Sequence, residues 1–215
     1  MNIVAISAGL GDPSSSHMLA ERLATATGAD QVRHVELRLV AHELVNALLT
    51  RVQSPALAEL VEAVVDSDGL VVVSPVFNAQ HSGLFKMFFD VLHEGALLDK
   101  PVLLAATGGS SRHSLAIDST MLPLFFYLKA AVVPTSVFAA TEDWGHSSSG
   151  LDDRIVKAAQ ELAEMVRLRS GDSLAERVDD DRQPASRLAP AKKAKRADAD
   201  DFTLSKSFQE MFDAI

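Results

Sequence analysis

The chain has 215 residues, of which 47% are hydrophobic, and this is enough for one α/β domain with a sizeable core. The formal net charge of −9 argues against nucleic acid or an anionic membrane as the main partner, and the absence of Cys excludes disulfides, thiolate catalysis and Cys-ligated metals. No apolar run approaches the roughly 20 residues that span a bilayer. The first residues predict a β-strand and lack the layout of a signal peptide, so we expect a cytoplasmic protein.

Strand and helix patterns alternate along the chain. Short apolar runs are typical of buried parallel strands, and amphipathic spacing is typical of helices. The expected strands are 2–7, 31–37, 69–74, 101–107 and 132–140, and the expected helices are 14–26, 41–50, 55–66, 82–93, 112–130 and 152–169. Pro123 must either kink the helix over 112–130 or mark a new start. The alternation predicts an α/β fold, a doubly wound five-stranded parallel sheet covered on both faces.

The composition changes after residue 169, where we expect the domain to end. Residues 170–200 mix charges with Pro and Ala, which predicts a disordered or loosely attached tail. Residues 201–215 regain large apolar side chains, among them Phe202, Phe208 and Phe212. This last segment is either a docking segment, on the body or on a second subunit, or a frayed end.

Polar segments follow the first, third and fourth expected strands. In a doubly wound sheet, ligands bind beyond the carboxyl ends of the strands, at the point where the strand order reverses. The first polar segment contains Gly9 and Gly11, followed by the hydroxyls of Ser14, Ser15 and Ser16 at a helix start. It resembles a phosphate cradle, because a helix N-terminus presents unpaired N–H groups to an anion. The third Gly of a dinucleotide fingerprint is missing, so a terminal monophosphate fits better than a pyrophosphate. Alternatively, the three Ser are only an N-cap cluster.

The other two polar segments suit a flat heteroaromatic ring. The second offers backbone groups and an amide side chain, and its candidate residues are Pro75, Val76, Phe77 and Asn78. The third has two adjacent glycines that let the backbone approach a ring closely, and its candidates are Thr107, Gly108, Gly109, Ser110 and His113. The simpler interpretation is that Gly108-Gly109 is an ordinary turn and that His113 is a capping residue.

These three segments together resemble the NADPH-dependent FMN reductase family, and more narrowly the reductases associated with luciferase-like monooxygenases. The family pattern of the second segment is Pro, any residue, Tyr or Phe, Asn, then Gly-x-x-Lys leading to Asp. This sequence matches it at Pro75, Phe77, Asn78, Gly83, Lys86 and Asp90. The similarity covers residues 1–168. Many relatives carry Arg in or just after the first segment, whereas this segment has none and places His17 there, which puts tight phosphate binding in doubt.

The resemblance implies a flavodoxin-like fold with FMN at the switch point. It implies an NAD(P)H:FMN oxidoreductase that passes hydride from NADPH or NADH to the flavin N5 and supplies reduced FMN to a monooxygenase. Ser7, Ser14 and Ser16 would hold the phosphate, residues 75–78 would line the ribityl chain and ring, and Gly108, Gly109 and Ser110 would face the pyrimidine edge. His113 would lie near the flavin. The cofactor carries the chemistry, so no catalytic acid or base is assigned.

Other functions remain open at this point. An FMN-containing quinone or azo reductase and a flavodoxin-like electron carrier are the alternatives. A serine hydrolase motif and a metal-binding His spacing are both missing from the sequence. The apolar arc around Phe85, Phe88 and Phe89 is either buried in one subunit or, as the resemblance favours, the interface of a homodimer, or of a tetramer built from it.

Overall fold

A computed structural model describes residues 1–145 and 149–170. The expected tail, apart from Ser170, and the expected docking segment at 201–215 lie outside the described residues. The strands are β1 (Asn2–Ser7), β2 (Gln31–Glu36), β3 (Gly69–Phe77), β4 (Gln80–His81), β5 (Pro101–Gly108), β6 (Ala131–Val132) and β7 (Val137–Ala140). The α-helices are α1 (Ser15–Ala26), α2 (Ala41–Thr50), α3 (Pro55–Asp66), α4 (Gly83–Asp90), α5 (Leu122–Tyr127) and α6 (Leu151–Arg169). Short turns of other helix types are η1 (Leu37–Val40), η2 (Ser111–His113), η3 (Ile117–Met121) and η4 (Thr141–Asp143).

The sheet has the order β2-β1-β3-β5, and both β6 and β7 pair with the outer edge of β5. All these pairings are parallel, so β6 and β7 together fill the fifth position of a flavodoxin-like sheet. The expected single strand over 132–140 is therefore two pieces. Pro134 lies between them, and it has no N–H to donate to the neighbouring strand. The predicted doubly wound five-stranded fold is confirmed.

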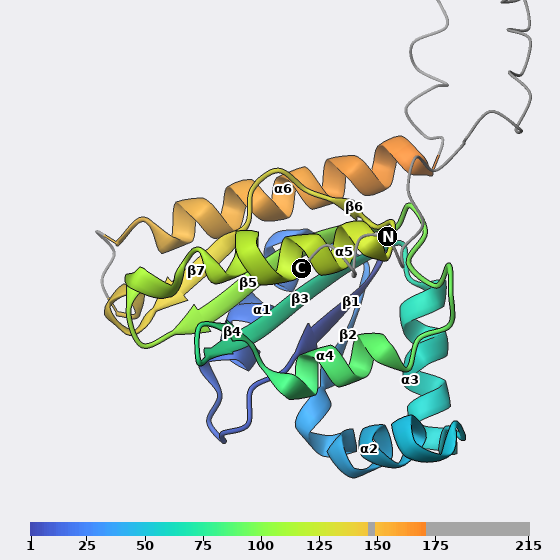
Figure 1. Cartoon of the computed structure of the whole chain (residues 1–215). Helices are drawn as coiled ribbons and strands as arrows, with labels where there is room; N and C mark the ends of the chain where they lie inside the picture. The colour runs from blue at the N-terminus through green and yellow to red at the C-terminus, as the bar shows by residue number, and fades with distance from the viewer. Residues whose placement is uncertain (146–148, 171–215) are drawn as a thin grey trace, which may run out of the picture. The chain divides into compact units, whose positions relative to one another are not determined.

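Alternate side chains of each strand enter two separate cores. Ile3 and Ala5 of β1 pack with α1 and α6, whereas Val4 and Ile6 pack with α2, α3, α4 and α5. Helices therefore cover both faces of the sheet (Figure 1), as an all-parallel sheet requires. No helix within residues 1–145 and 149–170 combines the length and apolar character needed to cross a membrane.

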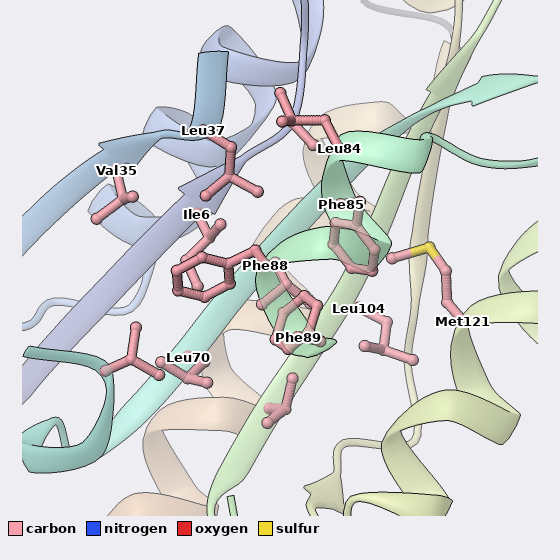
Figure 2. Close-up of a cluster of buried hydrophobic side chains, with 14 of the residues drawn as sticks. Ile6, Val35, Leu37, Leu70, Leu84, Phe85, Phe88, Phe89, Leu104 and Met121 are labelled. Carbon is pink, nitrogen blue, oxygen red and sulfur yellow. The ribbon is translucent and has the colours of Figure 1, made fainter. Parts of the chain in front are cut away.

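Helix α4 belongs to the core of a single chain. Phe85 and Phe88 are fully buried and Phe89 is 2% exposed. Figure 2 shows their rings lying among side chains of the sheet and of η3, namely Ile6, Leu70, Leu104 and Met121. Phe89 also contacts Phe125 of α5 edge to face, with ring centroids 4.9 Å apart. The expectation that these three rings face a second subunit is wrong, because α5 covers the part of the arc that the sheet does not reach.

The segment expected as one helix over 112–130 has three parts. It begins with η2, passes through the π-helical turn η3 and ends with α5. The N–H of Leu122 donates to the carbonyl of Ile117, five residues earlier. Ser119 and Thr120 each donate a hydroxyl to a carbonyl four residues earlier, which is a common cause of helix distortion. Pro123 lies in the first turn of α5 and so marks a new start, one of the two outcomes that its sequence position allowed.

Candidate functional site

The three polar segments, which we call the first, second and third loops (residues 7–17, 74–83 and 107–114), lie at the carboxyl ends of β1, β3 and β5, at one edge of the sheet. The strand register places Ser7 beside Val73 and Pro75 beside Thr107. A buried hydrogen bond of 2.7 Å joins the hydroxyls of Ser16, in the first turn of α1, and Thr107, at the end of β5. The tertiary structure therefore brings the first and third loops together across β3. This is the switch point of the sheet, because β2 and β3 lie on opposite sides of β1, so that the strand order reverses direction there.

In the first loop, Ser14 is the N-cap of α1. Its Oγ accepts the N–H of His17 at 3.2 Å, so the N-cap interpretation holds for this residue. The same oxygen would lie 2.0 Å from a Cβ at position 9, and this close approach requires Gly9. The cap leaves the N–H groups of Ser15 and Ser16 without an acceptor inside the helix. Ser15 is exposed and Ser16 is buried, so the exposed hydroxyl and these two N–H groups are the donors suited to an anion.

The second loop is a tight hairpin that the sequence analysis missed. Strand β3 continues past Pro75 and pairs with β4, with Val76 opposite His81 and Phe77 opposite Gln80. Asn78 and Ala79 form the turn with φ of 50° and 65°, the positive values that a two-residue type I′ turn needs at both positions. The turn exposes Asn78 and leaves the Phe77 side chain 45% exposed. Pro75 is buried and contributes to the position of the loop rather than to its surface.

Two buried serines that were not predicted hold this hairpin against α4. The Oγ of Ser74 accepts the N–H of Ser82 and donates to the carbonyl of Pro75, both at 2.9 Å. The Oγ of Ser82 in turn accepts the N–H of Phe85 at 3.2 Å and caps α4. Ser82 was recognisable as an N-cap, since it stands just before the helical run. Nothing local to Ser74 indicates its partner, which is eight residues away.

The two glycines of the third loop have different roles. A Cβ at Gly108 would lie 2.9 Å from Cζ of Phe138, so packing against that ring requires glycine there. A Cβ at Gly109 would meet nothing within 4 Å, so this position faces open space. Ser110 caps η2 by accepting the N–H of Arg112 at 3.4 Å, and His113 is exposed at the end of that turn. Gly109 is therefore the glycine that a flat ligand could approach.

The turn after β7 supports the third loop, through residues that the sequence analysis did not identify. The N–H of Ser111 donates to Glu142 at 3.3 Å. Backbone hydrogen bonds, first from the N–H of Glu142 itself and then from Ser111, hold the pKa of the Glu142 carboxyl below its usual value. Asp143 accepts from the N–H of Ala140 at 2.9 Å and from Arg154 of α6 at 3.2 Å. These contacts connect the third loop to the long helix α6.

The side chains of His17 and Lys86 each have an acidic partner one turn later on their own helix. His17 contacts Glu21 at 3.4 Å along α1, and Lys86 forms an ion pair with Asp90 one turn later on α4. Within the described part of the chain, no group of three or more His, Asp or Glu side chains is placed to hold a metal ion. The matched family residues Lys86 and Asp90 thus stabilise the surface of α4.

Two hollows in the described structure lie away from the three loops. One, of about 380 Å³, is at the amino ends of β1 and β2, beside Arg33 and Asp66. The other, of about 960 Å³, lies between α4, α5 and the segment 92–98. Neither is lined by a residue of the three loops.

The residues at this edge fit a flavin mononucleotide. The start of α1 has N–H donors and a hydroxyl for a phosphate, Asn78 and Phe77 are exposed on one side, and Gly109 leaves open space on the other. The hydroxyl pair of Ser16 and Thr107 retains one hydrogen that it can donate to a ligand. Bound FMN would supply the redox chemistry, and the protein would supply its orientation and surroundings.

Comparison with known proteins agrees with this geometry. The model of the NADPH-dependent FMN reductase family matches residues 1–145. An NADH-dependent FMN reductase, SfnE, from Pseudomonas putida is 38% identical over 74% of this chain and 89% of its own length. An FMN reductase (NADPH) from Pseudomonas aeruginosa is 37% identical over 78% of this chain and 94% of its own length. The crystal structure of an oxidoreductase from Corynebacterium diphtheriae is 45% identical, with a TM-score of 0.72, over 77% of this chain and 96% of its own.

The family model covers more than half of the chain, and the relatives match most of their own length. The expected family, fold and reaction class are confirmed. The chain belongs to the NADPH-dependent FMN reductase family and is an NAD(P)H:FMN oxidoreductase.

Proposed function

We propose that this protein binds FMN at the carboxyl edge of the sheet and reduces it with hydride from a nicotinamide cofactor. The phosphate lies at the start of α1, against Ser14, Ser15 and Ser16. Residues 76–78 face the ribityl chain and the ring, with buried Pro75 positioning them, and Gly109 and Ser110 face the pyrimidine edge. The hydrogen bond between Ser16 and Thr107 carries this proposal, because it brings the predicted phosphate loop and the predicted ring loop together.

The protein's part in the reaction is to orient the two reactants. The titratable side chains of the third loop, Arg112 and His113, are both exposed. The nicotinamide reaches the flavin from this open side, beside Arg112 and His113. Since the first loop holds the phosphate with hydroxyls and N–H groups, we further propose that FMN acts as a dissociable substrate.

Steady-state oxidation of NADH and NADPH, with and without added FMN, FAD and a quinone, tests this function. We expect oxidation that depends on added FMN and is slower with FAD. A flavin that copurifies and reduces the quinone without added FMN would favour the quinone or azo reductase alternative. A bound flavin that neither nicotinamide reduces would favour the electron carrier. The same assay chooses between NADH and NADPH, since the relatives include enzymes named for each.

The acceptor of the reduced flavin is proposed to be a flavin-dependent monooxygenase. The support is the resemblance to monooxygenase-partnered reductases, together with the open flavin side at Gly109. A coupled assay checks it. Reduced FMN made by this enzyme should sustain turnover of a luciferase-like monooxygenase in that assay. We propose that both proteins are cytoplasmic. Failure of the coupled assay while NAD(P)H oxidation continues would count against the partner alone.

We also propose that the chain forms a homodimer, or a tetramer, through α5. Phe126 and Tyr127 on this helix are 62% and 84% exposed, and Tyr127 borders the hollow of about 960 Å³. Large exposed aromatic side chains beside a hollow are typical of subunit interfaces. Sedimentation of the Tyr127→Lys variant should show dissociation, whereas Leu168→Lys, at an exposed position on α6, should not.

A further inference from the structure

The first loop lacks the cation that a phosphate group normally meets. From Ser7 to His17 the sequence contains no Lys or Arg, and it contains one carboxylate, Asp12. A phosphate monoester carries about −1.5 to −2 charges at neutral pH, so Asp12 alone would oppose its binding. A positive charge must come from another element if this loop is to prefer a phosphorylated flavin.

Arg38 reaches the first loop from the turn that follows β2. The register places Glu36, the last residue of β2, beside Ser7, the last residue of β1. Arg38 stands two residues later, in η1, between the buried side chains of Leu37 and Val40. Its Nε donates to Glu36 at 2.9 Å and its Nη2 donates to Asp12 at 3.3 Å. The guanidinium group therefore spans the gap between the end of β2 and the phosphate loop.

The two contacts of Arg38 differ in character. The bond to Glu36 is short, and the Glu36 side chain is only 24% exposed. The bond to Asp12 is longer, and the Asp12 side chain is 77% exposed. Glu36, and to a lesser degree Asp12, raise the pKa of Arg38 above its ordinary value, so the guanidinium group is a cation at any working pH. Glu36 thus anchors the guanidinium group, while the end that faces the loop is held weakly.

We propose that Arg38 is the cation of the phosphate site and that it makes the enzyme select FMN over riboflavin. This inference rests on the proposed FMN site. Arg38 keeps its Nε on Glu36, and its Nη end, which has donors to spare, shifts from Asp12 to the phosphate oxygens. Asp12 competes with the phosphate for the same guanidinium group. Removal of Arg38 and removal of the charge of Asp12 therefore have opposite effects on FMN affinity.

The experiment is a flavin titration of the full chain by quenching of flavin fluorescence, with FMN and with riboflavin, which lacks the phosphate. Loss of a charge-assisted pair of hydrogen bonds predicts that Arg38→Met weakens FMN binding by about tenfold or more. Riboflavin affinity should change by less than about twofold, since the guanidinium group does not meet the ring. Asp12→Asn should tighten FMN binding and leave riboflavin unchanged, and Arg38→Lys should restore part of the preference.

A matched control is available on β2, the strand that precedes Arg38. Arg33 of β2 donates to Glu59 at 2.8 Å and is paired with Val4, toward the amino end of the strand and away from the first loop at its carboxyl end. Arg33→Met removes an arginine of similar exposure and should leave both flavin affinities unchanged. Circular dichroism of each variant checks that the fold is retained. Asp12→Asn, at an exposed loop position, provides the second measurement if Arg38→Met does not fold.

Arg38 could instead only fasten the first loop to β2. Arg38→Met and Asp12→Asn would then both weaken FMN and riboflavin to the same extent, and this result would overturn the proposal. So would an unchanged ratio of FMN to riboflavin affinity in Arg38→Met. A wild-type chain that binds neither flavin would refute the FMN site itself, and the role of Arg38 with it.

Discussion

The second loop and helix α4 are adjacent in the sequence and use their side chains in opposite ways. In the loop, residues 77–80 are exposed, and the buried serines on either side of them serve hydrogen bonds. In the helix, the side chains of Leu84, Phe85, Phe88 and Phe89 are all buried in one chain. Apolar residues that looked like a subunit interface are core, and two polar residues next to the site are structural. Binding and folding should therefore respond separately to mutation.

The largest effect should come from α4. Phe88→Ala removes a fully buried ring between the helix and the sheet, and cavity formation predicts a loss of about 3–5 kcal/mol in the free energy of unfolding. Urea denaturation measures this loss. Phe77→Ala, at the half-exposed position in the loop, is the control and should cost less than about 1 kcal/mol. Phe88→Asp should prevent folding. A soluble, folded Phe88→Asp chain with altered assembly would show that α4 does form a subunit interface.

Ser74→Ala should disturb both regions, because this residue connects them. It leaves the buried N–H of Ser82 without its acceptor, which predicts a loss of about 1–3 kcal/mol in stability. The hairpin should also move relative to α4 and weaken FMN binding. Ser114→Ala, at an exposed position in the third loop, should change stability little and serves as the control. Normal stability and normal FMN binding in Ser74→Ala would show that the loop does not depend on this bond.

Gly109→Ala should affect binding alone. The added methyl group meets no protein atom within 4 Å, so stability should be unchanged, but it occupies the space proposed for the flavin ring. We expect FMN affinity to fall by about tenfold, a cost of about 1.4 kcal/mol. Gly83→Ala adds a methyl group in equally open space at the start of α4 and should leave FMN binding intact. Equal FMN affinities for the two variants would show that Gly109 does not contact the flavin.

The smallest effect should be a gain in stability. Ala79 has a positive φ of 65° in the hairpin turn, which is unfavourable for a residue with a Cβ. Ala79→Gly gives the Asn-Gly pair that type I′ turns prefer and should raise the free energy of unfolding by about 0.5–1 kcal/mol. Ala79→Val should lower it, because a β-branched side chain fits this conformation poorly. Thermal denaturation measures both, and a destabilised Ala79→Gly chain would contradict the assignment of the turn.

The sequence was informative wherever a local signal was sufficient. Apolar runs and amphipathic spacing located most strands and helices to within a few residues, and Ser14 stood where a helix cap is expected. The errors arose where a contact distant in sequence decides. Strand β3 extends past Pro75 because β4 returns beside it, and the strand expected over 132–140 breaks at Pro134.

The sequence by itself determined the doubly wound fold and the position of the three loops, because periodicity and loop composition are local properties, and its resemblance to a family indicated the reaction class. Only the tertiary structure decided which residues meet. Thr107 bonds to Ser16, Glu142 supports Ser111, and Arg38 reaches Asp12. It also decided that the aromatic face of α4 is covered by α5 and not by a partner. Such pairings join strands and loops that are far apart in the chain, and they depend on strand order and register, which no single segment encodes.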